Sequence, residues 1–89
     1  MNVSAFSVNV GYNNSVAKAR VVAVISAEAS PTRRLRTEAK QAGRLIDATN
    51  GRKTRSVIIT DSSHVVLSAL DPATLAERME TDVETGKNP

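Results

Sequence analysis

Cysteine and tryptophan are absent from the chain, and histidine, phenylalanine and tyrosine each occur once in its 89 residues. Without cysteine there is no disulfide framework and no thiolate ligand for a metal ion. A single histidine argues against a structural zinc site, which needs several nitrogen or sulfur ligands. The shortage of aromatic rings argues against a surface on which the bases of single-stranded nucleic acid stack. We therefore expect neither a metal nor a cofactor.

Long hydrophobic runs are also missing. No stretch approaches the ~20 apolar residues of a membrane span, and residues 1–10 lack both the basic region and the apolar core of a signal peptide. We expect a cytoplasmic protein that does not contact a membrane. The length suits one small domain, near the size at which a single core is only marginally stable, so oligomerisation is expected.

Charge is unevenly distributed along a chain whose formal net charge is +3. Residues 31–55 carry eight Lys or Arg residues against two acidic ones, whereas the residues after 55 carry two against six. Such segregation creates a local positive field that concentrates an anionic partner at one surface. From composition alone, a basic solvated surface without a specific ligand is an equally good interpretation.

The pattern of apolar residues predicts five strands and two helices. The strands are expected over 5–10, 18–26, 44–49, 54–60 and 64–70, and the helices over 30–42 and 71–79. Ser30 is expected to cap the first helix, with Pro31 at its first position and Gly43 after its last. This order predicts an α+β domain with a small, largely antiparallel sheet, one main helix and a short C-terminal helix. We expect one domain over residues 1–80 and a disordered acidic and polar tail over 81–89.

Asn50 and Gly51 lie between two strand-like runs and predict a β-hairpin, because both central residues of such a turn need a positive φ. The turn would place Arg52 and Lys53 at a solvent-facing tip. Cations on a rigid hairpin can contact a polyanion at little entropic cost. Asp47 precedes the turn and is expected to hold it by hydrogen bonds.

Three of the predicted strands are apolar at consecutive positions, so both faces of the sheet need cover. A main helix with a thin apolar stripe and a short second helix do not supply enough of it. We therefore expect another copy of the chain to cover the rest. The alternative is that the β-branched side chains stay exposed on an outer face.

Two sequence patterns superficially suggest catalysis or nucleotide binding. The segment 51–54 has the Gly, Lys and Thr of a phosphate-binding loop, but Arg52 separates Gly from Lys, no earlier glycine has the required spacing, and a strand follows. Asp61, Ser63 and His64 have the residue types of a hydrolase triad, yet near-neighbours in one turn cannot adopt its geometry. We expect no enzyme and no small-molecule substrate.

The cations between positions 33 and 55 can neutralise phosphates. Binding to duplex DNA requires only positive side chains arranged to meet its phosphate groups. The candidate DNA-binding residues from this segment are Arg33, Arg34, Arg52, Lys53 and Arg55. Two alternatives stay open: a scaffold whose basic surface meets an acidic protein, and an RNA-binding protein.

Several separated motifs together carry a family resemblance. They are Gly11-Tyr12-x-Asn14, Arg20, Ser30-Pro31, the block from Gly43 to Arg55 that contains Leu45-Ile46-Asp47-Ala48-Thr49-x-Gly51, and Asp61-Ser62-x-His64. In this order and spacing they resemble the RemA family of bacterial extracellular-matrix regulators, from about Val8 to Arg78.

The resemblance implies a nucleoid-associated, double-stranded DNA-binding transcriptional regulator that activates biofilm-matrix operons. It also implies a subunit similar to LytTR-type domains and a closed homo-oligomeric ring that bends or wraps DNA around its outside. By position, it assigns DNA contacts to Arg20, Arg52 and Lys53 and places Pro31 close to a subunit contact. Lys53 stands where the family usually has arginine, so it lacks the planar fork that grips phosphate at two points.

Overall fold

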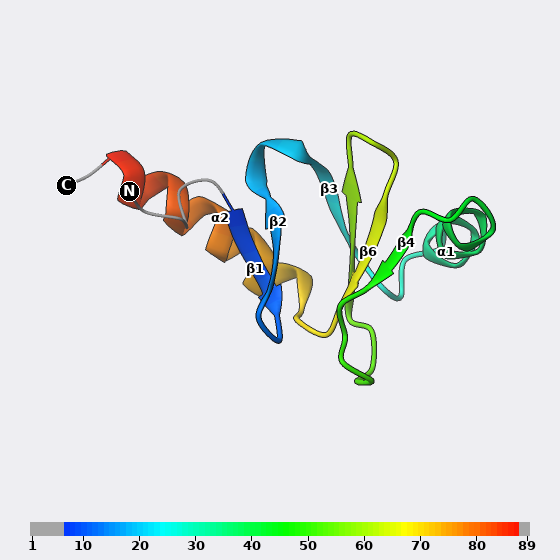
Figure 1. Cartoon of the computed structure of the whole chain (residues 1–89). Helices are drawn as coiled ribbons and strands as arrows, with labels where there is room; N and C mark the ends of the chain where they lie inside the picture. Colours follow the sequence, from blue (N-terminus) through cyan, green and yellow to red (C-terminus); the bar gives the residue numbers. More distant parts are fainter. Residues whose placement is uncertain (1–6, 88–89) are drawn as a thin grey trace.

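Three layers make up the chain in its computed structural model, which describes residues 7–87 and describes side chains up to residue 80. Helix α1 lies on one side of a four-stranded sheet, and a two-stranded hairpin together with α2 lies on the other (Figure 1). The elements are β1 (Ser7–Gly11), β2 (Asn14–Ala17), a short 3-10 turn (Lys18–Arg20), β3 (Val21–Ser26), α1 (Thr32–Gln41), β4 (Leu45–Asp47), β5 (Ser56–Thr60), β6 (Val65–Ser68) and α2 (Pro72–Lys87). The predicted α+β class is confirmed.

The main sheet has the strand order β3-β5-β6-β4. Strands β3, β5 and β6 pair antiparallel, whereas β4 pairs parallel with β6. The sheet is therefore largely antiparallel, as predicted. Strands β5 and β6 occupy the centre, and their apolar residues at consecutive positions are buried on both faces.

The face of the sheet toward α1 carries one of the two hydrophobic clusters. Val57, Val65 and Leu67 pack there around Ala39 of the helix, with Leu45 at the margin. The apolar stripe of α1 is as thin as the sequence indicates: its buried residues are Thr32 and Ala39. The helix covers part of this face and leaves a hollow beside it.

The opposite face is covered by the β1–β2 hairpin and α2. Val10, Ile58, Val66 and Leu75 form its cluster together with Ala48. The hairpin contains a strand, β2, that the sequence analysis did not predict, because polar residues at 13–15 have the composition of a loop. This hairpin supplies the cover that the two helices lack.

Elements of the same chain lie over both faces of the sheet, which weakens the argument that a second copy is needed to cover them. Among residues 7–80, the exposed large hydrophobic side chains are Tyr12, Val22 and Ile46, which lie in the β1–β2 turn, on β3 and on β4. Self-association itself stays a prediction, because an uncovered sheet face no longer supports it.

The predicted turn at Asn50 and Gly51 is confirmed, but the predicted pairing of the strands on either side of it is wrong. Both residues have positive φ, 54° and 78°, and the N–H of Arg52 donates to the carbonyl of Thr49 at 3.0 Å. The flanking strands β4 and β5 do not pair, however, since β6 lies between them. The turn depends on local φ preferences, whereas the pairing depends on burying β6 between two neighbours, which no local signal encodes.

The ends of α1 agree with the expectation in part. Ser30 does not cap α1: Pro31 occupies the cap position without a side-chain hydrogen bond. The predicted end at Gly43 is confirmed, because its N–H and that of the next residue donate to the carbonyls of Lys40 and Ala39. This is a Schellman motif, with Gly43 at a φ of +72°.

The second helix was predicted to end at Met79, and this is wrong because α2 continues to Lys87. It therefore enters the segment that was expected to be a tail. Residues 88–89 lie outside the described residues, and the domain boundary at residue 80 stays a prediction.

Gly43→Ala tests the helix stop. No atom lies within 4 Å of an added Cβ, so the cost comes from the left-handed backbone alone, about 1 kcal/mol of unfolding free energy. Urea denaturation measures it. Gly43→Asn is the matched control and is expected to cost less, because Asn tolerates this conformation. Equal losses for the two variants would contradict the explanation.

Candidate nucleic-acid interface

The turn that carries Arg52 and Lys53 is held by Asp47. Its Oδ1 accepts hydrogen bonds from the hydroxyl of Thr49 at 2.6 Å and from the N–H of Thr49 at 2.9 Å. Thr49 is buried, so the turn is attached to the core at this point. The prediction that Asp47 holds the turn by hydrogen bonds is confirmed.

The same contacts lower the pKa of Asp47 from its ordinary value. The hydrogen bond from the Thr49 hydroxyl is the largest cause, followed by the one from its N–H, while partial burial opposes them and the charge of Arg36 adds to them. The carboxylate is therefore kept ionised and directed at the protein's own backbone.

Tyr12, at the tip of the β1–β2 hairpin, lies beside Arg52, whose Cζ is 6.0 Å from the centroid of the tyrosine ring. The tip is a tight turn, with φ of 52° at Tyr12 and 67° at Asn13. The side-chain amide of Asn14 donates to the carbonyls of Gly11 and Tyr12. Two turns from distant parts of the chain thus meet, and the aromatic ring limits the directions that the Arg52 side chain can take.

Two adjoining hollows run along this end of the sheet. The first, called here the turn hollow, has a volume of about 550 Å³ and is lined by Ala27, Glu28, Arg36, Asp47, Thr49, Gly51, Arg52, Lys53 and Thr54. The second, called the α1 groove, has a volume of about 550 Å³ and is lined by Ala27, Thr32, Arg33, Arg36, Thr37, Lys40, Leu45, Asp47 and Leu67. Because Ala27, Arg36 and Asp47 line both, the two hollows form one continuous surface.

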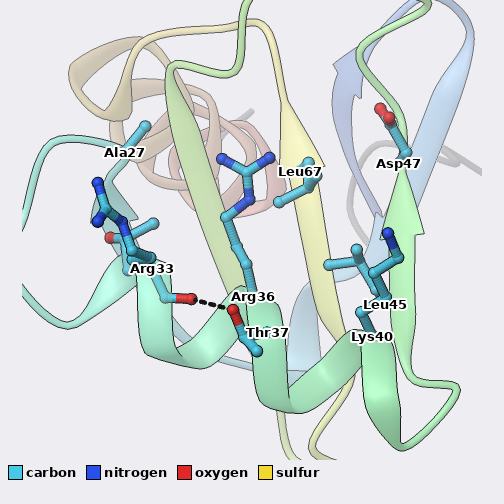
Figure 2. Close-up of a pocket in the computed structure, with 9 residues that line it drawn as sticks. Ala27, Arg33, Arg36, Thr37, Lys40, Leu45, Asp47 and Leu67 are labelled. Atoms are coloured by element: carbon cyan, nitrogen blue, oxygen red, sulfur yellow. Dashed lines mark hydrogen bonds between the residues drawn. The ribbon is translucent and has the colours of Figure 1, made fainter.

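Figure 2 shows how the α1 groove is built. Arg33, Arg36 and Lys40 project from α1, while Leu45, Leu67 and Asp47 come from strands on the other side. Within the described residues, the side chains of Arg33, Arg36, Lys40 and Lys53 form no hydrogen bond and no salt bridge. They are exposed cations. Arg36 interacts electrostatically with Asp47, whereas an anion could approach the other three cations without first displacing a partner within that part of the chain.

Arg20 lies elsewhere. It precedes β3, whereas the turn hollow lies at the other end of that strand, so six residues of β3 separate them by ~20 Å at about 3.3 Å per residue. Its Nη1 is 3.3 Å from Asp61 Oδ2, and both side chains are largely exposed, 67% and 46%. The structure does not bring Arg20 together with Arg52 and Lys53 within one copy.

The remaining predicted site residues are dispersed. Arg34 is exposed on α1 and lines neither hollow; Arg55 is exposed just before β5. Pro31 is exposed at the start of α1. Sequence reasoning missed Tyr12 and Arg36 as members of the site. The Gly-Tyr-Asn-Asn turn was a signal for Tyr12, but nothing local showed which turn it would meet.

The residues considered for a catalytic triad have other partners. His64 Nδ1 lies 2.7 Å from the hydroxyl of Ser62, and Asp61 pairs with Arg20. In the part of the chain that the structure describes, His, Asp and Glu side chains form no group that could hold a metal ion. No described helix has the length and apolar character needed to cross a bilayer.

Fold and site together define a small α+β protein with a continuous cationic surface at one end of its sheet. Over residues 7–79 the chain matches the family described as RemA-like, extracellular matrix regulatory protein A-like. The chain belongs to this family, and the predicted membership is confirmed.

Curated relatives share half or more of their aligned residues with the chain, and each carries the printed name "Putative regulatory protein". A Crocosphaera subtropica protein is 54% identical over 78 residues, which cover 88% of this chain and 87% of the relative. One from Thermotoga petrophila is 56% identical over 71 residues, covering 80% and 77%. One from Nitratidesulfovibrio vulgaris is 58% identical over 71 residues, covering 80% and 81%.

Acid titration tests the role of Asp47. Because its folded pKa lies below the ordinary aspartate value, the ionised carboxylate contributes stability above that ordinary value. This contribution is lost as the pH falls through the lowered folded pKa. Asp47→Asn keeps an oxygen acceptor but does not titrate. We expect the unfolding free energy of the unchanged protein, measured in urea across the acid range, to fall more steeply than that of the variant. Parallel slopes would refute the assignment.

Proposed function

We propose that the protein is a regulator that binds double-stranded DNA through the phosphate backbone. The observation that carries the proposal is the turn hollow, in which Arg36, Arg52 and Lys53 surround a turn that Asp47 and Thr49 hold in place. Cations on ordered backbone lose little entropy when they contact phosphate. Membership of a family described as extracellular matrix regulators supports a role in expression of matrix operons, activation included.

Duplex DNA fits this surface better than a single strand. Tyr12 is the aromatic side chain exposed among residues 7–80, and Arg52 already lies against its ring. Proteins that hold single strands stack successive bases on several such rings. A surface of cations without stacking platforms instead suits a regular array of phosphates.

Arg20 extends the proposal to a second contact point. The ~20 Å between it and the turn hollow corresponds to about six base pairs at 3.4 Å per step. One copy would then meet the backbone at two places, with Arg52 and Lys53 at one and Arg20 at the other. Its salt bridge to Asp61 is exposed and can exchange for a phosphate at small cost.

A single copy offers few phosphate contacts, so tight binding requires repetition. We propose that copies associate into a ring, with each turn hollow repeated at a constant interval around it. Many weak contacts along a curved path would offset the energy of bending the duplex. Recognition would then depend on DNA flexibility more than on contacts with base edges.

Salt dependence of binding tests the phosphate contacts. Removing one contact by Arg52→Ala or Lys53→Ala is expected to reduce the slope of log affinity against log salt by about 0.9 for each copy bound. Gel-shift or anisotropy titration of a promoter fragment measures it. Arg44→Ala is the control, since it removes the same charge at an exposed residue that lines neither hollow. Unchanged slopes, or equally tight binding of single-stranded RNA, would count against the proposal.

Tyr12 has a separate test. Tyr12→Ala removes the ring beside Arg52 while leaving every charge in place. Without the ring, the Arg52 side chain has to be ordered on binding, which costs about 0.5–1.5 kcal/mol and predicts about two- to ten-fold weaker DNA binding with an unchanged salt slope. Tyr12→Phe keeps the ring and should bind normally. A change in slope in the Ala variant would mean that Tyr12 acts in another way.

A further inference from the structure

The two helices carry opposite charge and lie at opposite ends of the molecule. Figure 1 shows α1 at one end of the long axis and α2 extending to the other, and that axis measures 43 Å. Helix α1 has four cations and one acidic residue, whereas α2 has four acidic residues and two cations. The helices of one copy therefore cannot pair with each other.

The cations of α1 form a stripe along the α1 groove. Arg33, Arg36 and Lys40 are three and four residues apart, which places them on one face of the helix, and all three line the groove (Figure 2). Asp47 is the acidic residue that lines it, and its Oδ1 already accepts two hydrogen bonds from Thr49. The groove thus has a surplus of positive charge along one wall.

Helix α2 has acidic residues at the same spacing. Glu77 and Glu80 are three residues apart and exposed, and Glu84 follows four residues later in the sequence. Within residues 7–80 neither Glu77 nor Glu80 has a hydrogen bond or a salt bridge. The inner side of the helix is occupied by the buried Leu75, so the acidic stripe faces away from the core.

We propose that the α1 groove of one copy receives the acidic stripe of α2 from a second copy. The described residues Glu77 and Glu80 match Arg33 and Arg36 in spacing and are opposite in sign, and the sequence continues the pattern with Glu84 as Lys40 does on α1. Leu45, half-buried in the groove wall, gives the incoming helix an apolar contact. The proposal deepens the self-association part of the proposed function and rests on it.

Such a contact is head-to-tail, because two different surfaces meet. Heterologous contacts of this kind generate a ring when the rotation between copies closes and a filament when it does not. Individual exposed ion pairs are weak, so the stripes set the register and direction of assembly, and the number of copies supplies its strength. Arg52 and Lys53 line the turn hollow and not the α1 groove, so this contact leaves both uncovered for DNA, whereas Arg36 lines both hollows.

The test uses two charge-reversed variants. A head variant carries Arg33→Glu and Lys40→Glu, and a tail variant carries Glu77→Lys and Glu80→Lys. Arg36 is left unchanged because it also lines the turn hollow. Arg34→Glu is the matched control, since Arg34 lies on the same helix outside the groove. Mass is measured by light scattering after size exclusion and by native mass spectrometry, with circular dichroism to verify folding.

We expect each variant alone to be a single copy, because its two stripes then have the same sign. An equimolar mixture should assemble with the two variants alternating, since reversed head meets reversed tail and native head meets native tail. The control should keep the mass of the unchanged protein. Raising the salt concentration should shift that protein toward single copies.

Three results would overturn the proposal. The variants could keep the unchanged protein's mass, which would indicate another interface such as the free edges of β3 and β4. The mixture could stay dissociated, or the unchanged protein could itself be a single copy. DNA titration of the same samples separates this inference from the proposed function. A head variant that keeps both the native mass and DNA binding would overturn the inference and leave the proposed DNA binding standing. A protein that assembles but does not bind duplex DNA would overturn the proposed DNA binding and leave the inference standing. If reversal unfolds a variant, Arg33→Gln with Lys40→Gln replaces it and should lower the assembled fraction.

Discussion

Burial of β5 and β6 on both faces is the constraint on which the rest of the structure depends. Their consecutive apolar residues require two covering layers, and the chain supplies α1 on one side and a hairpin with α2 on the other. This arrangement brings the β1–β2 tip next to the turn after β4. The cationic surface is thus a consequence of how the core is covered, and its position does not depend on the charges themselves.

Local signals were reliable where a single residue determines the backbone. Gly43 ends α1, and Asn50 with Gly51 forms the turn, because each position needs a positive φ that few residues adopt. Strand pairing was not predictable in the same way. Whether β4 joins β5 or β6 is decided by which strand must be buried centrally, and the sequence around residue 50 contains no information on that. Strand β2 was missed for the same reason: its polar residues have the composition of a loop, and they form a strand because they pair with β1.

The residues of the candidate site also divide into those that local sequence signals identify and those that they do not. Arg52 and Lys53 could be selected from charge and turn chemistry alone, since both signals lie within a few residues. Arg36 and Tyr12 could not, because they reach the same place from a helix and a hairpin that are remote in sequence. Arg20 is a different case: the family resemblance assigned it the same function as Arg52 and Lys53, but the whole of β3 separates it from those two cations.

The parallel pairing of β4 with β6 is short, and this affects how firmly the cationic turn after β4 is held. Three residues of β4 pair with β6 at the edge of the sheet, and the flanking residues Arg44 and Ala48 each add one backbone hydrogen bond to β6. Edge strands with few backbone bonds open more easily than the core they join. Leu45 packs against one hydrophobic cluster and Ala48 belongs to the other, so opening of β4 would loosen both clusters at their margins together with the cationic turn. The position of that turn is therefore coupled to the packing of the core.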